Sequence, residues 1–459
     1  MKKLIALFLC LMLVLPVAAA LADDMTTEIT LWTFPVGGFG DDEQVQTLIA
    51  DFNAVYPNIK VNVEYLDYTN GDVQVTTAME AKTTPDIIFE GPERLVAVYA
   101  AANALVPLDD LWTDEAMADI SAGVAAACKD AAGVYYEYPL CSTAHCMVID
   151  KAAFEKADAL QYIDMEKHTW TTEGFEMALR ALVEAGYNPT GLIFCSGQGG
   201  DQGTRALVNN LYSGKFTSPD FSKYTMDSEE NIKALTMLQK WAEEGLIAFD
   251  PSINGGEELA LFVNGTSKMA FCWNAAIEGL NRDKLADGVE LFPMTFPTDK
   301  GDPELCGGIW GFGIFDNGDA AKIEAAKTFI RFVCDDPVQV RKSVYMSGYF
   351  SVRSSVTGLY AGTEKEYLDT YAPFVQYLGD YYQVAPNWNT QRYEWWNLLQ
   401  RVGAGGNVAD EVALRKHFRL SVYGAGSGFF PWVRRFSHVH VPVQQRFSLH
   451  PFRVYLRRS

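Results

Sequence analysis

Segments typical of strands and helices alternate between residues 29 and 89. Apolar residues at 29–32, 61–65 and 85–89 follow the pattern of strands. Between them, residues 41–56 carry apolar side chains at helical spacing, which gives this helix one buried face. A second helical stretch is expected over about 73–82. Strands that are separated by helices pair in parallel through crossover connections. The sequence therefore predicts an α/β fold with parallel-type sheets flanked by helices.

The same pattern continues beyond this region. A helix is predicted over residues 172–184, and Asp227 with Glu230 three residues later resembles the capping box of another. Asp319 can cap a further helix near 320–334. No long Ser/Pro-rich linker interrupts the chain before its basic end. Two lobes built from interleaved segments are therefore favoured over two domains joined by a linker.

The start of the chain has the features of an export signal. Lys2 and Lys3 precede an apolar run at 4–17, and Ala-Leu-Ala at 20–22 supplies the small residues that a signal peptidase needs. We therefore interpret residues 1–22 as a cleaved signal peptide and expect the protein in the periplasm or on the extracellular face of the cell envelope. The alternative is an uncleaved anchor helix.

The end of the chain differs in charge from the rest. Residues 415–459 contain nine Lys or Arg and no Asp or Glu, although the whole chain has a net charge of -21. A body this acidic repels phosphate backbones, so no nucleic-acid partner is expected. We interpret the tail as the product of a shifted reading frame or as disordered. A basic arm for an anionic envelope surface and an unfamiliar folded extension are the alternatives.

The motifs of common enzyme classes are missing. The chain has no phosphate-binding loop of the Walker type, no dinucleotide-binding glycine motif after a strand and no nucleophile elbow. Seven cysteines remain after residue 22, an odd number that suits buried apolar fillers better than a disulfide framework. We expect no cofactor, no metal and no catalysis. Abundant carboxylates leave a two-carboxylate glycosidase open.

Seven segments, in the correct order, carry a resemblance to a known family. They are Phe-Asn-Ala-Val-Tyr-Pro-Asn-Ile-Lys-Val at 52–61, Pro-Asp-Ile-Ile at 85–88 with Ala-Leu-Val-Pro-Leu at 104–108, 133–139 with 147–150, Thr-Trp-Thr-Thr-Glu-Gly-Phe at 169–175, 262–270, Gly-Gly at 307–308, and the helix near 320–334. Together they resemble the family 1 extracellular solute-binding proteins, which capture sugars for ATP-driven importers. Lys268 stands where that family usually has alanine.

The resemblance implies the two-lobed type II fold of periplasmic binding proteins, with a ligand cleft between the lobes. One lobe would hold 23–140 and 290–335, and the other 141–289 and 336–414. The protein is expected to be a monomer that captures a sugar or oligosaccharide, closes around it and delivers it to an ABC transporter permease. A secreted carbohydrate-active hydrolase and a binder of a non-sugar nutrient are the alternatives.

A sugar site needs aromatic rings to stack on the sugar faces and polar groups to bond the hydroxyls. In open α/β sheets, such groups lie in loops after the carboxyl ends of strands. Trp170, Trp241 and Trp396 lie on helical repeats and are expected in the core instead. The candidates for the cleft, chosen from loops after strands and from the expected crossings, are Trp273, Trp32, Trp310, Glu90, Asn274, Trp388, Tyr138 and Arg353.

Overall fold

The computed structural model describes residues 26–194, 196–197, 201–219, 221–379 and 381–413. The signal peptide predicted over 1–22 and the basic tail predicted over 415–459 lie outside the described residues. Everything below concerns the described part of the chain.

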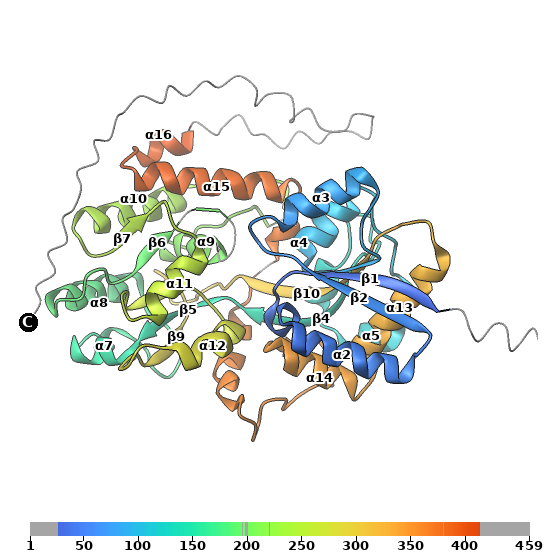
Figure 1. The fold of residues 1–459 in the computed structure, drawn as a ribbon. Coiled ribbons are helices and arrows are strands. Elements are labelled where there is room, and N and C mark those ends of the chain that lie inside the picture. Colours follow the sequence, from blue (N-terminus) through green and yellow to red (C-terminus); the bar gives the residue numbers. More distant parts are fainter. Residues whose placement is uncertain (1–25, 195, 198–200, 220, 380, 414–459) are drawn as a thin grey trace, which may run out of the picture. The chain divides into compact units, whose positions relative to one another are not determined.

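Six strands form the larger sheet, in the order β11-β4-β10-β3-β1-β2 (Figure 1). β1 pairs in parallel with both β2 and β3, which confirms the parallel crossovers predicted for the first 60 residues of the body. β10 runs antiparallel to both of its neighbours, β3 and β4. The strands are β1 (Thr27–Thr33), β2 (Ile59–Tyr65), β3 (Ile87–Glu90), β4 (Tyr138–Ala144), β10 (Gly307–Ile314) and β11 (Phe350–Ser351).

Helices cover both faces of this sheet. On one face, Phe329 of α13 (Ala320–Asp335) packs edge-on against Phe52 of α2 (Asp42–Val55) and against Phe312 of β10. On the other face, Leu95 lies against Gly313 of β10. Further elements around the sheet are Gly37–Gly40, α3 (Gly71–Ala81), α4 (Pro92–Arg94), the π-helix Leu95–Ala100, α5 (Asp114–Asp119), α6 (Ala122–Ala127) and α14 (Gln339–Ser347).

A second, three-stranded sheet has β5 (Cys146–Asp150) at its centre, between β8 (Met269–Trp273) and β9 (Leu291–Met294). Both neighbours run antiparallel to β5, whereas the sequence suggested parallel-type pairing throughout. β5 follows β4 of the larger sheet directly after His145, and its partners β8 and β9 come from more than 100 residues later in the chain. A short parallel pair, β6 (Leu192–Phe194) and β7 (Ala248–Asp250), lies nearby.

The helices around the second sheet bury the tryptophans that were expected in the core. Trp170, Trp241 and Trp396 are all buried, which confirms the prediction. These helices are α7 (Lys151–Lys156), α8 (Thr172–Glu184), α9 (Asp201–Leu211), α10 (Glu229–Glu243), α11 (Gly255–Val263), α12 (Ala275–Asn281), α15 (Trp388–Gly403) and α16 (Val408–Ala413). The 3₁₀ segments are Leu160–Tyr162, Arg282–Lys284, Glu366–Tyr377 and Tyr382–Val384.

The buried apolar side chains form two separate clusters, one around each main sheet. Within the described residues, the chain passes from one cluster to the other mainly at 141–144, 306–309 and 352–360. Two stretches lie in a different cluster from their expected lobe. β9 was expected in the first lobe, but it pairs with β5 in the second sheet. α14 was expected in the second lobe, but its buried apolar side chains belong to the first cluster.

The predicted cap of α13 is confirmed, whereas that of α10 is wrong by one residue. The Asp319 side chain accepts hydrogen bonds from the amides of Ala321 and Lys322. At α10, the cap is Ser228, whose hydroxyl accepts from the amide of Asn231 at 3.2 Å. Serine and aspartate are about equally good caps, so the sequence alone did not fix the register.

Replacing the observed cap should therefore cost more stability than replacing the predicted one. We expect Ser228→Ala to lower the free energy of unfolding by about 1 kcal/mol, and Asp227→Ala to lower it by no more than about 0.5 kcal/mol. Urea unfolding of both variants measures the difference. A larger loss in Asp227→Ala would place the cap at Asp227.

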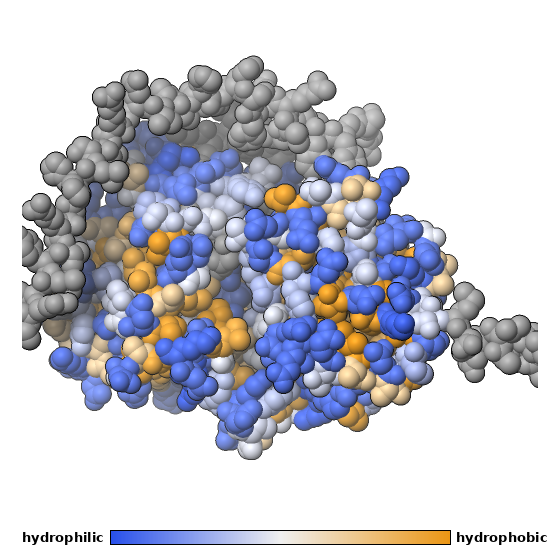
Figure 2. Space-filling view, viewed as in Figure 1, coloured by the Kyte–Doolittle hydropathy of each residue, from blue (hydrophilic) through white to orange (hydrophobic). Residues whose placement is uncertain are grey.

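Six cysteines are described, and all are buried: Cys128, Cys141, Cys146, Cys272, Cys306 and Cys334. Their burial supports their interpretation as small apolar side chains. Of the helices described, none has the length and apolar character needed to cross a membrane. On the face shown in Figure 2, apolar residues form several separate patches among hydrophilic ones.

Candidate functional site

A pocket of about 340 Å³ is lined by residues of both apolar clusters and their connections. Its volume falls within the range of roughly 300–1,000 Å³ that is typical of small-molecule sites. The wall combines aromatic rings with carboxylate, guanidinium and amide groups. The residues on which the description below depends are Tyr68, Glu90, Glu93, Arg94, His145, Gln202, Asn274, Gly308, Trp310, Tyr349, Tyr381 and Arg392.

One guanidinium organises the acidic side of the pocket. Arg94 donates from Nη1 to Oε1 of Glu90 at 2.9 Å and from Nε to Oδ1 of Asp72 at 2.6 Å. The Glu93 carboxylate lies 3.7 Å from the same Nη1. Glu90 ends β3, and Arg94 lies one helical turn later, so the strand end and the following helix fix this pair locally.

Glu93 is also held by a residue from a distant part of the chain. The Tyr381 hydroxyl donates to Oε2 of Glu93 at 2.5 Å, although the two residues are 288 positions apart. Tyr381 follows the 3₁₀ segment Glu366–Tyr377, and the buried apolar residues of that segment pack in the second cluster. This hydrogen bond therefore ties the C-terminal part of the fold to the helix after β3.

An aromatic surface forms another part of the wall. The indole of Trp310 stacks on the ring of Tyr349 at a centroid distance of 4.5 Å and an angle of 13°. Gly308 provides the room for this indole, since a Cβ at that position would lie 2.2 Å from the Trp310 ring. His145 meets the indole edge-on. Flat, stacked rings of this kind suit the apolar face of a ligand.

Two amide side chains meet at His145. The side-chain nitrogens of Gln202 and Asn274 each lie 3.3 Å from Nδ1 of His145. The Asn274 oxygen also accepts from the amide of Ile277, because Asn274 caps the start of α12. The cap therefore fixes the orientation of the Asn274 amide at the pocket.

Burial and neighbouring charge alter the acidity of two glutamates on this side of the sheet. Burial raises the pKa of Glu90 to about 7, with the carboxylates of Glu93 and Asp72 adding to the rise and Arg94 opposing it. Burial also raises the pKa of Glu137 well above its usual value, and Glu93 and Glu90 act in the same direction. Among the described residues, neither carboxyl oxygen of Glu137 has a hydrogen-bond partner. Glu137 therefore keeps its proton in the fold at a pH where an exposed glutamate is ionised.

This buried acid should make folding stability depend on pH. Because its pKa is raised by folding, the stability contribution is present at low pH and is lost as the pH rises above the unfolded value of about 4.5. The loss is about 1.4 kcal/mol per pH unit while the folded state keeps the proton. We expect Glu137→Gln to abolish this loss, so that its stability relative to the native chain grows from pH ~5 to pH ~7.

Thermal unfolding at several pH values measures this effect. Glu166→Gln is the matched control, since Glu166 is exposed and its replacement should leave the pH profile unchanged. Parallel pH profiles for the native chain and Glu137→Gln would show that Glu137 is not the buried acid described here.

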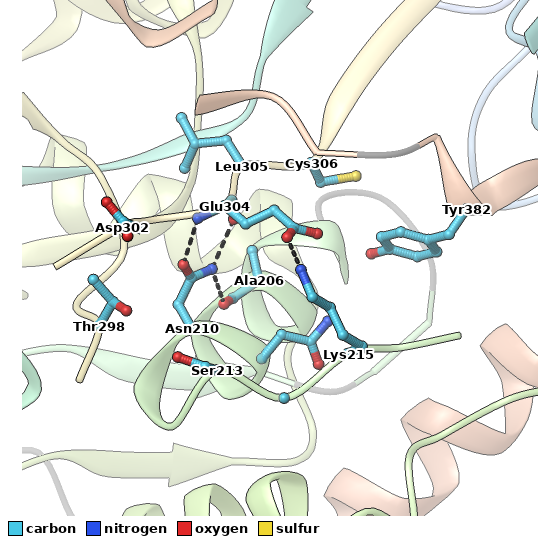
Figure 3. A pocket seen from close by; sticks show the side chains of 12 residues that line it. Ala206, Asn210, Ser213, Lys215, Thr298, Asp302, Glu304, Leu305, Cys306 and Tyr382 are labelled. Carbon is cyan, nitrogen blue, oxygen red and sulfur yellow. Dashed lines mark hydrogen bonds and ion pairs between the residues drawn. The ribbon is translucent and has the colours of Figure 1, made fainter. Parts of the chain in front are cut away.

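A second pocket, of about 60 Å³, lies beside α9 (Figure 3). Its polar groups largely satisfy each other. The Asn210 side chain donates to the carbonyls of Ala206 and Glu304 and accepts from the Glu304 amide, and Lys215 pairs with the Glu304 carboxylate. This volume is far below that of typical ligand sites. The larger pocket is therefore the candidate site.

Three of the eight predicted site residues line the larger pocket. They are Glu90, Asn274 and Trp310. Each follows the reasoning from the sequence, because Glu90 ends β3, Asn274 directly follows β8, and Trp310 follows the glycine pair at the start of β10.

The other five predicted residues are buried away from the lining of this pocket. Trp273 is 0% exposed, and its indole nitrogen donates to the Tyr371 hydroxyl at 2.6 Å. Strand alternation points its side chain away from the pocket, while those of its neighbours Cys272 and Asn274 reach it. Trp32 lies in the first apolar cluster and Trp388 in the second.

Tyr138 and Arg353 form a structural unit instead of a ligand contact. Arg353 donates to the Tyr138 hydroxyl at 3.0 Å and to Asp335 at 2.6 Å, and Tyr138 donates to Asp335 at 2.8 Å. Asp335 ends α13, so these groups lie where β4 meets the end of that helix, and none of them lines the pocket. Successive side chains of a strand lie on opposite faces of the sheet, so a prediction that selects the wrong face puts the side chain on the wrong side.

Sequence reasoning did not select several residues of the pocket wall. Glu93 and Arg94 could have been found from their position within one turn of Glu90. Tyr349 and Tyr381 gave no such signal, because only the tertiary fold brings them to the pocket. Across the part of the chain that the structure describes, no group of three or more His, Cys, Asp or Glu is arranged to hold a metal ion.

The fold and the pocket define a two-lobed α/β ligand-binding protein. The family model for bacterial extracellular solute-binding proteins matches residues 38–340, which is more than half of the chain. The chain therefore belongs to the bacterial extracellular solute-binding protein family. Membership places it among exported proteins. No curated protein matches the chain.

Solved structures share the fold at low sequence identity. The GacH receptor of Streptomyces glaucescens, studied unliganded and with acarbose, matches with a TM-score of 0.67 and 15% identity over 85% of this chain and 96% of that one. An ABC substrate-binding protein from Listeria monocytogenes in complex with cycloalternan gives 0.67 and 18% over 85% and 97%. UgpB from Mycobacterium tuberculosis in complex with glycerophosphocholine gives 0.67 and 17% over 85% and 96%.

Proposed function

We propose that this protein captures a sugar or oligosaccharide in the larger pocket and delivers it to the permease of an ABC transporter. The observation that carries this proposal is the make-up of the pocket wall. The stacked pair of Trp310 and Tyr349 offers a flat apolar surface, and carboxylate and amide groups surround it. A pyranose needs both, since its ring faces are apolar and its rim carries hydroxyls.

The pocket joins segments that belong to different apolar clusters. Glu90 and Arg94 come from the first sheet and its helix, whereas Asn274 follows a strand of the second sheet. A ligand that contacts both sets gains binding energy only when the two are correctly placed around it. It therefore favours the closed arrangement by its differential affinity for that arrangement. A permease that recognises this arrangement would receive loaded protein in preference to empty protein.

The proposal includes a monomeric, exported protein that neither makes nor breaks covalent bonds. The family consists of binding proteins, which supports this view. The neighbouring structures include complexes with acarbose and cycloalternan, which support a carbohydrate ligand. The signal peptide expected over residues 1–22 is consistent with export.

The experiment compares two tryptophans of similar exposure. Trp310 is 7% exposed and lines the pocket, whereas Trp32 is 8% exposed and does not. A thermal-shift screen of mono- and disaccharides first identifies sugars that raise the melting temperature. For such a sugar, Trp310→Phe should weaken binding by about three- to ten-fold, the usual worth of an aromatic contact. Trp32→Phe should change it by less than about two-fold.

Isothermal titration calorimetry of the two variants provides the measurement. Equal losses in both variants would mean that the stacked surface at Trp310 does not hold the ligand. If no saccharide raises the melting temperature, the proposal of a sugar ligand is wrong.

A further inference from the structure

Acidic groups converge on one side of the pocket. Glu90 and Glu93 line it, and Asp72 shares the Arg94 guanidinium with both. Glu137 lies behind them, and the charges of Glu93 and Glu90 add to the rise in its pKa that burial causes. One guanidinium is thus shared by three carboxylates, with a fourth carboxyl beside them. Burying several carboxyl groups together is unfavourable unless protons or cations balance them.

Two carboxyl groups in this cluster have oxygens without a hydrogen-bond partner among the described residues. No described residue donates a hydrogen bond to Oε1 of Glu93, whose nearest cationic group is Nη1 of Arg94 at 3.7 Å. The Glu93 side chain is 13% exposed and lines the pocket. Glu137 is 0% exposed, and both of its carboxyl oxygens are without a partner among the described residues. Of these two residues, only Glu93 lines the pocket, so a ligand in the pocket can bind Oε1 of Glu93. Buried polar groups of native proteins are almost always satisfied, which favours a polar ligand group at this oxygen.

The phenol groups that face the cluster add no charge to it. The phenol rings of Tyr68, Tyr99 and Tyr381 surround it, and burial raises the pKa of each hydroxyl, so all are neutral. The charges that act most strongly on Glu90 are those of Arg94, Glu93 and Asp72. Arg392 also lines the pocket, and its guanidinium lies over the Trp396 ring at 5.7 Å.

Aromatic rings at the same place favour a cation. Tyr68 and Tyr381 line the pocket beside Glu93, and Tyr68 already faces the Arg94 guanidinium at 5.5 Å. The faces of such rings attract cations, and aromatic rings combined with carboxylates are a common arrangement for binding ammonium groups. A neutral hydroxyl could donate to Oε1 of Glu93, whereas an ammonium group also interacts favourably with the charge of this carboxylate.

We propose that the natural ligand is a saccharide with a positively charged amino group, and that this group binds Oε1 of Glu93 on the acidic side of the pocket, next to Glu90. The inference rests on the proposed sugar-binding function and narrows its substrate class from neutral sugars to amino sugars. Glu93 determines specificity by forming a charge-assisted hydrogen bond to the ammonium group. Trp310 and Tyr349 contact the ring of the sugar whether it is charged or neutral.

Binding of an ammonium group should be coupled to proton release. With its pKa near 7, Glu90 is partly protonated in the empty pocket at neutral pH. A cation nearby favours the ionised carboxylate, so the ligand and the proton compete. The affinity for an amino sugar should therefore rise from pH ~5 to pH ~7, while the affinity for its neutral counterpart should not rise.

The test uses matched sugars that differ at a single substituent. Isothermal titration calorimetry at pH ~6 compares glucosamine, N-acetylglucosamine and glucose, then the corresponding β-1,4-linked disaccharides and the galactose series. For each amino sugar that binds, we expect a dissociation constant at least about ten-fold lower than those of its acetylated and hydroxyl counterparts. Titration in buffers of different ionisation enthalpy should show protons released with the amino sugars only.

Glu93→Gln keeps the shape of the side chain and removes its charge. It should reduce the preference for the amino sugar towards equal affinities, and it should weaken the pH dependence. Glu28→Gln is the control, because Glu28 is 60% exposed and pairs with Lys60 outside the pocket lining. It should leave the preference unchanged.

The outcomes separate this inference from the function on which it rests. If neutral sugars bind as tightly as or more tightly than amino sugars, the inference is wrong and the sugar-binding function stands. If no amino sugar binds, the inference is wrong whatever the neutral sugars do. If neither kind binds, both proposals fail. A preference for amino sugars that survives in Glu93→Gln would place the ammonium group elsewhere and would also contradict the inference.

Discussion

The shared guanidinium of Arg94 is the interaction on which the candidate site depends. It lies one turn after the end of β3 and neutralises part of the charge of Glu90, Asp72 and Glu93. Without it, the carboxylates would repel each other at the carboxyl end of a central strand. Removing one partner of a buried charged network leaves the others uncompensated, which costs several kcal/mol. Arg94 therefore couples the helix after β3 to the carboxylates on the acidic side of the pocket.

The local features of the fold could be predicted from the sequence. Apolar spacing located β1, α2, β2, α3 and β3, and Asp319 marked the start of α13, because these signals depend on neighbouring residues alone. The direction of β5 and the cluster to which α14 belongs could not be predicted. Both depend on contacts between segments far apart in the chain, and no local pattern encodes them.

The candidate site shows the same division. Glu90, Asn274 and Trp310 could be predicted because each follows a recognisable strand or glycine pair. Trp273 was misplaced because a one-residue alternation decides which side of a strand a side chain takes. Tyr381 reaches Glu93 across 288 residues of sequence, so only the assembled fold reveals it. The carboxyl oxygens of Glu137, which lack a hydrogen-bond partner in the described part of the chain, became visible in the same way.

The central claim is that the pocket binds a saccharide reversibly and leaves it unchanged. Equilibrium dialysis with an isotope-labelled sugar, followed by chemical analysis of the recovered sugar, tests this claim most directly. We predict saturation at one sugar per chain and recovery of the intact molecule. New reducing ends in the recovered material would identify a hydrolase, and the absence of saturable binding would contradict the account of the pocket as a ligand site.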